Sequence, residues 1–136
     1  MDEATPDQAK RDQATLDQAG LHAIVDAWPG VESGIKWEHD LVFTVAGKMF
    51  CVLCVSGADS GDATVGRLSF KVEDDRFLEL TERPGFVPAP YLARAHWVLV
   101  AKPGSLPAGE LHDLLRRSYE LVREKLPKKM QRELAD

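Results

Sequence analysis

Apolar residues recur along the chain at two spacings, which predict helices near both ends and strands between them. Four residues at helical spacing mark the first helix: Leu21, Ile24, Val25 and Trp28. This helix is predicted to begin near Leu16 and to end at Pro29-Gly30. A longer stripe predicts a helix from residues 105–107 to residues 126–127, with a face formed by Leu111, Leu114, Leu115, Ser118, Leu121 and Val122. A short helix over residues 74–83 and a last turn or two over residues 128–134 complete the helical pattern.

Alternating or continuous apolar residues predict five strands in the middle of the chain. These strands cover residues 35–38, 41–46, 48–55, 67–72 and 95–101. Gly47 joins the second and third strands in a tight hairpin, and a polar, glycine-rich loop over residues 56–66 joins the third and fourth. Residues 84–92 contain three prolines and therefore predict an extended, irregular crossing before the last strand.

The order of these elements, α-β-β-β-β-α-β-α, predicts an α+β fold. Strands joined by short turns favour a largely antiparallel five-stranded sheet, with the helices packed mainly on one face and the other face partly open. Edge strands at residues 35–38 and 95–101 could pair in a dimer, but the sequence leaves the oligomeric state open. Residues 1–14 carry almost no large apolar side chain and are predicted to be a disordered or frayed acidic leader, followed by a single domain over residues 15–136.

Composition agrees with one globular domain and excludes a membrane protein. The chain has 136 residues, of which 44% are hydrophobic and 29% are charged. It has neither an apolar run of about 20 residues nor a basic and apolar start, so we expect no membrane contact and a cytoplasmic location. The net charge is −5, and residues 1–40 hold nine acidic and three basic residues. A field of this sign repels phosphate and argues against nonspecific binding of nucleic acid.

Cys51 and Cys54 have the C-x-x-C spacing of redox and zinc sites, but they lie within an apolar run that predicts a buried strand. Residues three apart in a strand point to opposite faces, so the two thiols cannot share a ligand. We therefore expect two inert thiols, which suits a reducing compartment.

The sequence contains no recognisable catalytic constellation. The histidines are scattered singly, and the loop with Asp59 and Asp62 lacks the Lys-Ser/Thr pair of a phosphate loop. These two carboxylates have no third ligand nearby in sequence. We expect no catalytic residue, no metal and no cofactor.

Basic residues suggest a surface that could contact phosphate. Arg67 and Lys71 share one face of the fourth strand, and Lys48 lies at a hairpin tip. The C-terminal region adds seven cations: Arg116, Arg117, Arg123, Lys125, Lys128, Lys129 and Arg132. Hairpin tips and exposed strands can hold a nucleic-acid backbone. A solvated helix face with interleaved glutamates explains the C-terminal cations equally simply.

Tyr91, Arg94 and Trp97 are the second candidate site. On the surface they would form an aromatic and cationic patch able to stack on a base or hold an anion. Alternatively, Trp97 belongs to the core and Tyr91 fixes the loop by a hydrogen bond.

A set of short motifs occurs in a characteristic order: Trp28-Pro29-Gly30-Val31-Glu32, Gly47-Lys48-Met49-Phe50, Arg83-Pro84-Gly85, Pro88-Ala89-Pro90-Tyr91-Leu92, Ser118-Tyr119-Glu120-Leu121-Val122 and Leu126-Pro127-Lys128-Lys129. Over roughly residues 16–134 the chain resembles the MmcQ/YjbR family of small bacterial proteins. The resemblance implies an α+β fold whose hairpins are likened to a double-wing DNA-binding arrangement, and it implies no catalytic residues. The wings would be the hairpin around Gly47-Lys48 and the loop over residues 57–66, with Arg67 and Lys71 at the base of the second.

Three functional hypotheses follow from the sequence. The first is a non-enzymatic, cytoplasmic bacterial protein that binds double-stranded DNA weakly, with contacts from Lys48, Arg67, Lys71, Lys128 and Lys129. The second is an adaptor that binds a protein or peptide with its open sheet face or with the crossing over residues 84–92. The third is a site for a small molecule or anion at Tyr91, Arg94 and Trp97.

Overall fold

The computed structural model describes residues 18–37, 40–55, 66–89 and 92–134. The predicted leader over residues 1–14 and most of the loop over residues 56–66 lie outside this part of the chain. Within it, the elements follow in the order α2 (Gln18–Val25), β1 (Val31–Lys36), β2 (Asp40–Val45), β3 (Lys48–Cys54), β4 (Leu68–Lys71), α3 (Asp74–Thr81), β5 (Phe86–Pro88), η1 (Ala93–Ala95), β6 (Trp97–Val100), η2 (Pro103–Ser105), α4 (Ala108–Glu124) and α5 (Lys128–Leu134). None of the helices in these residues is long and apolar enough to cross a membrane.

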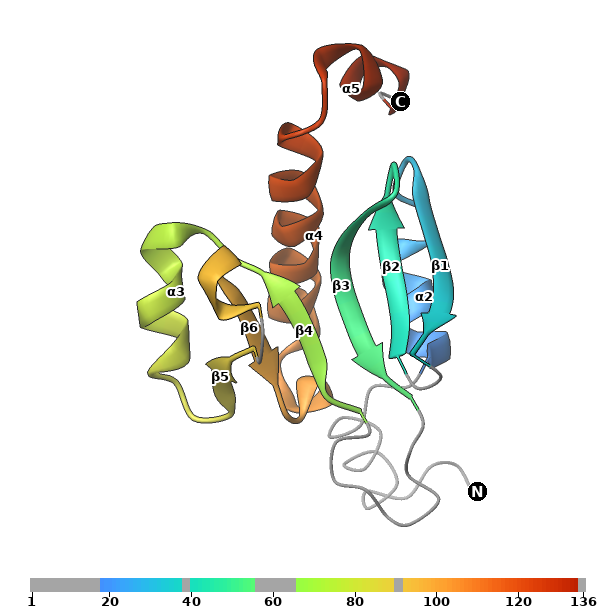
Figure 1. Cartoon of the computed structure of the whole chain (residues 1–136). Helices are drawn as coiled ribbons and strands as arrows, with labels where there is room; N and C mark the ends of the chain where they lie inside the picture. Colours follow the sequence, from blue (N-terminus) through green and yellow to red (C-terminus); the bar gives the residue numbers. More distant parts are fainter. Residues whose placement is uncertain (1–17, 38–39, 56–65, 90–91, 135–136) are drawn as a thin grey trace, which may run out of the picture.

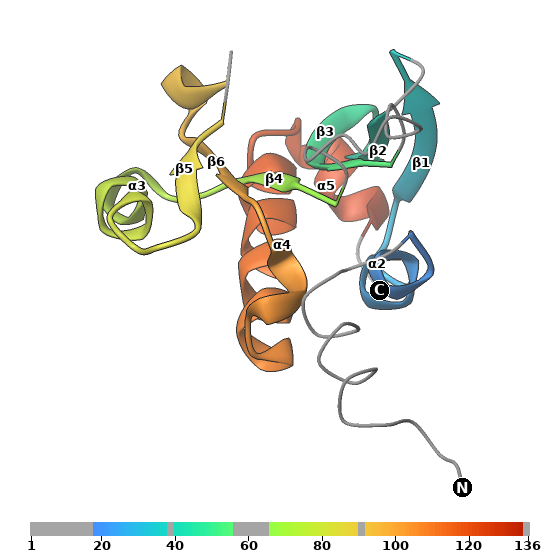
Figure 2. The ribbon, with the colours of Figure 1, turned by 90° about the horizontal axis from the view of Figure 1, so that it is seen from below.

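The strands form one antiparallel sheet in the order β1-β2-β3-β4-β6-β5. Helix α4 packs across β2, β3 and β4, and α2 lies beside it on the same side of the sheet (Figures 1 and 2). Helix α3 packs against β5 and β6 at the other end of the sheet. The α+β class and the antiparallel sheet with helices mainly on one face are therefore confirmed.

The sheet has six strands rather than the five that the sequence predicts. The additional strand is β5, which forms within the predicted crossing over residues 84–92 and pairs with β6. Its three residues include Pro88, which is tolerated because an edge strand leaves one side of its backbone unpaired. Consequently β6, predicted to be an edge strand, lies inside the sheet between β4 and β5.

Strand β1 starts at Val31, four residues earlier than the apolar pattern predicts. Glu32, Ser33 and Gly34 show no apolar alternation because all three are exposed at the edge of the sheet. They are strand residues through their pairing with β2, where Glu32 lies opposite Thr44. Pairing with a neighbour, rather than burial, defines this strand.

The core lies between the sheet and helices α2 and α4. Strand residues with alternating burial point into it, and the helices add Leu21, Val25, Leu111, Leu114, Leu115 and Tyr119. Cys51 is fully buried in this core, and burial raises the pKa of its thiol. Cys54 lies one residue beyond the buried Leu53 and thus on the opposite face, and neither cysteine is in a disulfide. The predicted separation of the two thiols is confirmed.

Candidate nucleic-acid interface

Positively charged side chains gather at the end of the molecule where α4 stops. Lys125 caps α4, and Lys128, Lys129 and Arg132 follow on α5, all four of them exposed. Within the described residues, none of the four forms an ion pair. Their charges therefore remain available to an anion from solution.

The last residue of α5, Leu134, lies at the end of the sheet where the β2–β3 hairpin turns. A Cβ atom built on Gly30 would clash with Leu134 Cδ2 and would lie 3.5 Å from Val45 Cγ2, so these three residues are neighbours. Val45 is in turn the strand partner of Lys48, which is exposed at the start of β3. We call the end of the molecule that holds α5 and the turn of the β2–β3 hairpin the cationic end (Figure 1). Its exposed cations are Lys48, Lys125, Lys128, Lys129 and Arg132.

A groove of about 560 Å³ between α4 and α5 lies within the cationic end, lined by Glu120, Arg123, Glu124, Lys128, Gln131 and Arg132. Gln131 Nε2 donates to the carbonyl oxygens of Glu124 and Leu126 over 3.1 and 2.8 Å. Arg123 donates to the carbonyl oxygen of Gln131 over 3.3 Å. These hydrogen bonds hold the two helices at a fixed angle, so the cations around the groove are preorganised.

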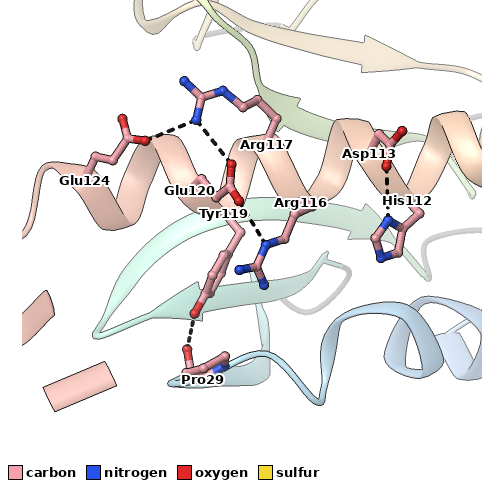
Figure 3. A network of polar contacts seen from close by, with 8 residues as sticks. All are labelled: Pro29, His112, Asp113, Arg116, Arg117, Tyr119, Glu120 and Glu124. Atoms are coloured by element: carbon pink, nitrogen blue, oxygen red, sulfur yellow. Dashed lines mark hydrogen bonds and ion pairs between the residues drawn. The ribbon is translucent and has the colours of Figure 1, made fainter. Parts of the chain in front are cut away.

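The glutamates beside the groove are neutralised by arginines of α4 (Figure 3). Arg117 Nη1 lies 3.3 Å from Glu120 and 3.1 Å from Glu124, and Arg116 Nε lies 3.1 Å from Glu120. Arg117 also pairs with Glu73, just before α3, and the hydrogen bonds with Glu73 and then Glu124 raise the pKa of Arg117. The net charge of the groove is therefore set by its other cations.

Lys71, one of the five residues predicted to contact DNA, has its charge directed at the protein. Its Nζ donates to the carbonyl oxygen of Ala95 over 2.6 Å. Burial and then the charge of Lys125 lower its pKa, while Asp74 acts in the opposite direction. Lys71 is thus close enough to the cationic end for Lys125 to lower its pKa. Its side chain is half-buried, however, and its ammonium group already donates to a carbonyl oxygen.

Arg67 lies at the opposite end of the sheet from Lys48. Its carbonyl oxygen accepts a hydrogen bond from the N–H of Cys54, the last residue of β3, whereas Lys48 is the first. Seven residues of strand span about 20 Å at roughly 3.3 Å per residue. The two predicted wings therefore leave the sheet at opposite ends. Lys48, Lys128 and Lys129 thus lie on elements at the same end of the molecule, whereas Arg67 lies at the other end of the sheet.

The predicted patch of Tyr91, Arg94 and Trp97 is not assembled from the residues that the structure describes. Trp97 is only 5% exposed, so its ring packs as part of the sheet and is not available for stacking. Arg94 is exposed on η1, and Tyr91 lies outside the described residues. A ligand role for Arg94 and Tyr91 stays a prediction.

Among the residues that the structure describes, histidine and carboxylate side chains pair in three places, each on the surface. His96 Nδ1 lies 2.6 Å from Asp74, His22 pairs with Asp26, and His112 with Asp113. The hydroxyl groups of Thr81, Ser105 and Ser118 donate to backbone carbonyls instead of to these imidazoles. In the described part of the chain, no three potential ligands converge on a metal position.

The sequence signals the cations of this end but not their assembly. Arg123, Lys125 and Arg132 are visible as part of a basic C-terminal region, whereas Gln131 carries no signal of its own. Its role depends on how α5 folds back onto α4, where Leu134 also comes to lie against Gly30. A contact between residues so distant in the chain leaves no local pattern.

The sequence matches the family model YjbR over residues 26–121. The chain belongs to the YjbR family. The matched segment runs from the residue after α2 into the last third of α4, so it contains the whole sheet, while the cationic α5 lies beyond it. The resemblance found in the sequence is thus confirmed.

Two solved structures are similar to this YjbR chain. The crystal structure of the Deinococcus radiodurans protein DR2400, with a domain of family DUF419, is 28% identical; the similarity covers 90% of this chain and 89% of that chain, with a TM-score of 0.73. The crystal structure of a protein from Pseudomonas syringae is 25% identical and covers 77% of this chain and 97% of that chain, with a TM-score of 0.61. Among curated proteins, none matches the chain.

Proposed function

We propose that this YjbR-family member is a non-enzymatic, cytoplasmic bacterial protein that binds double-stranded DNA weakly through phosphate contacts at the cationic end. The observation that supports this proposal most directly is that Lys48 and the lysines of α5 are exposed at the same end of the molecule. Lysines without ion pairs hold phosphates without reading base edges, so we expect little sequence preference. The buried thiol of Cys51 agrees with a reducing compartment.

Screening by salt reconciles this proposal with a net charge of −5. In salt near physiological strength, exposed charges more than about 8–10 Å apart are largely screened from each other. The net charge of the chain then acts on DNA mainly at low salt, whereas the lysines of the cationic end act on the phosphates that they contact. The result is weak binding, because few contacts oppose an unfavourable overall field.

The first test is a titration with a short mixed-sequence duplex, in which backbone amide shifts and affinity are followed over a range of salt concentrations. The double variant Lys128→Ala/Lys129→Ala removes up to two phosphate contacts. We expect it to lower affinity equally for all sequences and to reduce the slope of log affinity against log salt by about 2. Lys102→Ala is the matched control, since Lys102 is exposed before the start of α4, at the far end of that helix.

Amide shifts at Lys48, Lys128 and Lys129 that fade with salt would support the proposal. An unchanged spectrum at low salt, or an equal loss of affinity in the Lys102 control, would overturn it.

An adaptor that binds a protein or peptide is the second candidate function. It is favoured by Val87 of β5, which is 48% exposed in the predicted crossing. Such binding would persist at salt concentrations that abolish phosphate contacts.

A further inference from the structure

Strands β1 and β5 are the two terminal strands of the sheet that the described residues form. The two terminal strands differ: β5 has three residues and contains Pro88, a device that prevents further pairing, whereas β1 has six residues and no proline. Among the described residues, none pairs with the outer side of β1 (Figures 1 and 2). Its backbone can therefore accept another strand.

Large apolar side chains are exposed on and directly after this strand. Ile35 is 55% exposed and Trp37 is 61% exposed. Trp37 also has a φ of 53°, in the left-handed region that bulky residues rarely adopt. An exposed indole on strained backbone suggests a contact surface, because its burial would offset the strain.

The sequence of β1 is complementary to itself when a second copy is antiparallel. We propose that β1 pairs with β1 of a second copy of this chain about a two-fold axis at Gly34, joining the two sheets into one. In this register Glu32 of each copy lies opposite Lys36 of the other, so that two oppositely charged pairs form on one face. On the other face, Ser33 lies opposite Ile35 of the second copy, and Trp37 comes next to Val31.

Neighbouring registers lose this complementarity. Moving the axis by one residue to Ser33 sets Glu32 opposite Gly34, and moving it to Ile35 sets Lys36 opposite Gly34, so neither shift leaves an opposed charge pair. Gly34 itself is exposed, and a Cβ built on it would have nothing within 4 Å. A glycine inside a strand often marks a close approach of another backbone, as the axis of this dimer requires.

Charge-reversal variants test both the surface and the register. In the dimer, position 32 of each copy lies opposite position 36 of the other. Glu32→Lys therefore creates two pairs of facing lysines, and Lys36→Glu creates two pairs of facing glutamates. We expect each variant alone to weaken dimerisation about ten-fold, because both symmetric pairs change from attraction to repulsion. An equimolar mixture of the two variants restores both pairs, so we expect it to dimerise like the parent protein. Sedimentation equilibrium over a range of protein concentrations measures each case.

Glu82→Lys and Lys102→Glu are matched controls, because both residues are exposed elsewhere on the molecule and the changes in net charge are the same. Neither control should alter dimerisation, and Trp37→Ala should weaken it without a change in charge. A parent protein that stays monomeric at all concentrations would overturn the proposal. So would a dimer that Glu32→Lys leaves unaffected, or a variant mixture that fails to recover.

Discussion

Ser118 is a fully buried polar residue that joins helix α4 to the centre of the sheet. Its Oγ donates to the carbonyl oxygen of Phe50 over 2.6 Å and accepts from the N–H of Lys71 over 2.9 Å. Phe50 is the extra residue of a bulge in β3, since the register with β2 shifts beside it. Cys51 and Phe70 are the last residues that β3 and β4 pair with each other. The hydroxyl thus satisfies one backbone group on each strand just beyond this pair.

We predict that Ser118→Ala lowers the free energy of unfolding by about 1–3 kcal/mol, because it leaves two backbone groups unsatisfied near the core. Urea unfolding followed by circular dichroism measures the loss. Ser69→Ala is the control, since Ser69 lies on the opposite face of β4 and is only half-buried. Equal losses in the two variants would show that the hydrogen bonds of Ser118 contribute nothing specific.

At the scale of elements, the position of α5 depends on a glycine between α2 and β1. Gly30 has a φ of +80°, which other residues adopt only at a cost, and its missing side chain leaves room for Leu134. The contact seats α5 against the start of β1 and the end of β2. Together with the hydrogen bonds of Gln131 and Arg123, this contact holds the lysines of α5 at the end of the molecule that also carries Lys48.

We predict that Gly30→Ala destabilises the protein more than Gly47→Ala. Gly47 has a φ of +83°, but a Cβ there would have nothing within 4 Å, so both variants share the backbone cost of about 1–2 kcal/mol. Only Gly30→Ala adds the clash with Leu134, whose terminal methyl group must move to another rotamer, so we expect an excess of about 0.5–1.5 kcal/mol. Differences in the free energy of unfolding measure this excess.

The additional loss in the free energy of unfolding should disappear when Gly30→Ala is made in a Leu134→Ala background. The new methyl group at position 30 then has room. An excess that survives this change would mean that the contact with α5 is not its cause. The same variants connect structure with the proposed function, because displacement of α5 should also weaken the contribution of Lys128 and Lys129 to DNA binding.

At the scale of the whole molecule, one core joins the first helix to the last long one. Leu21 and Val25 of α2 are fully buried in the cluster that also contains Phe43 of β2 and Leu115 and Tyr119 of α4. Helix α2 is therefore a part of the domain rather than an appendage. The start of the domain at residue 15 stays a prediction from the sequence.

We predict that deletion of residues 2–14 changes the free energy of unfolding by less than about 0.5 kcal/mol, as expected for changes outside the core. Deletion of residues 2–25 is the contrasting variant, because it also removes Leu21 and Val25. Their burial contributes about 1.5–3 kcal/mol each, a large share of a typical stability of about 5–15 kcal/mol. Thermal and urea unfolding compare the two. A marked loss with the shorter deletion would move the domain boundary towards the N-terminus.

Local pattern predicted most of the elements and only part of the candidate site. The periodic face of α4 and the alternation in β2 and β4 depend on neighbours in the chain, so their burial is readable from sequence. The cations of the C-terminal region are readable for the same reason. Their position at the same end of the molecule as Lys48 depends on the packing of α5. The distance between Arg67 and Lys48 depends on the strand register.

The sequence by itself determined the helices, the core-facing residues of the strands and membership of the YjbR family, because these properties follow from spacings of a few residues and from ordered motifs. Only the tertiary structure decided the sixth strand, the open edge at β1 and the cationic end. Strand β5 is too short and too rich in proline to be predicted without β6 beside it. An edge exists only once a sheet has an order, and the position of α5 involves Gly30, a residue about a hundred positions earlier in the chain.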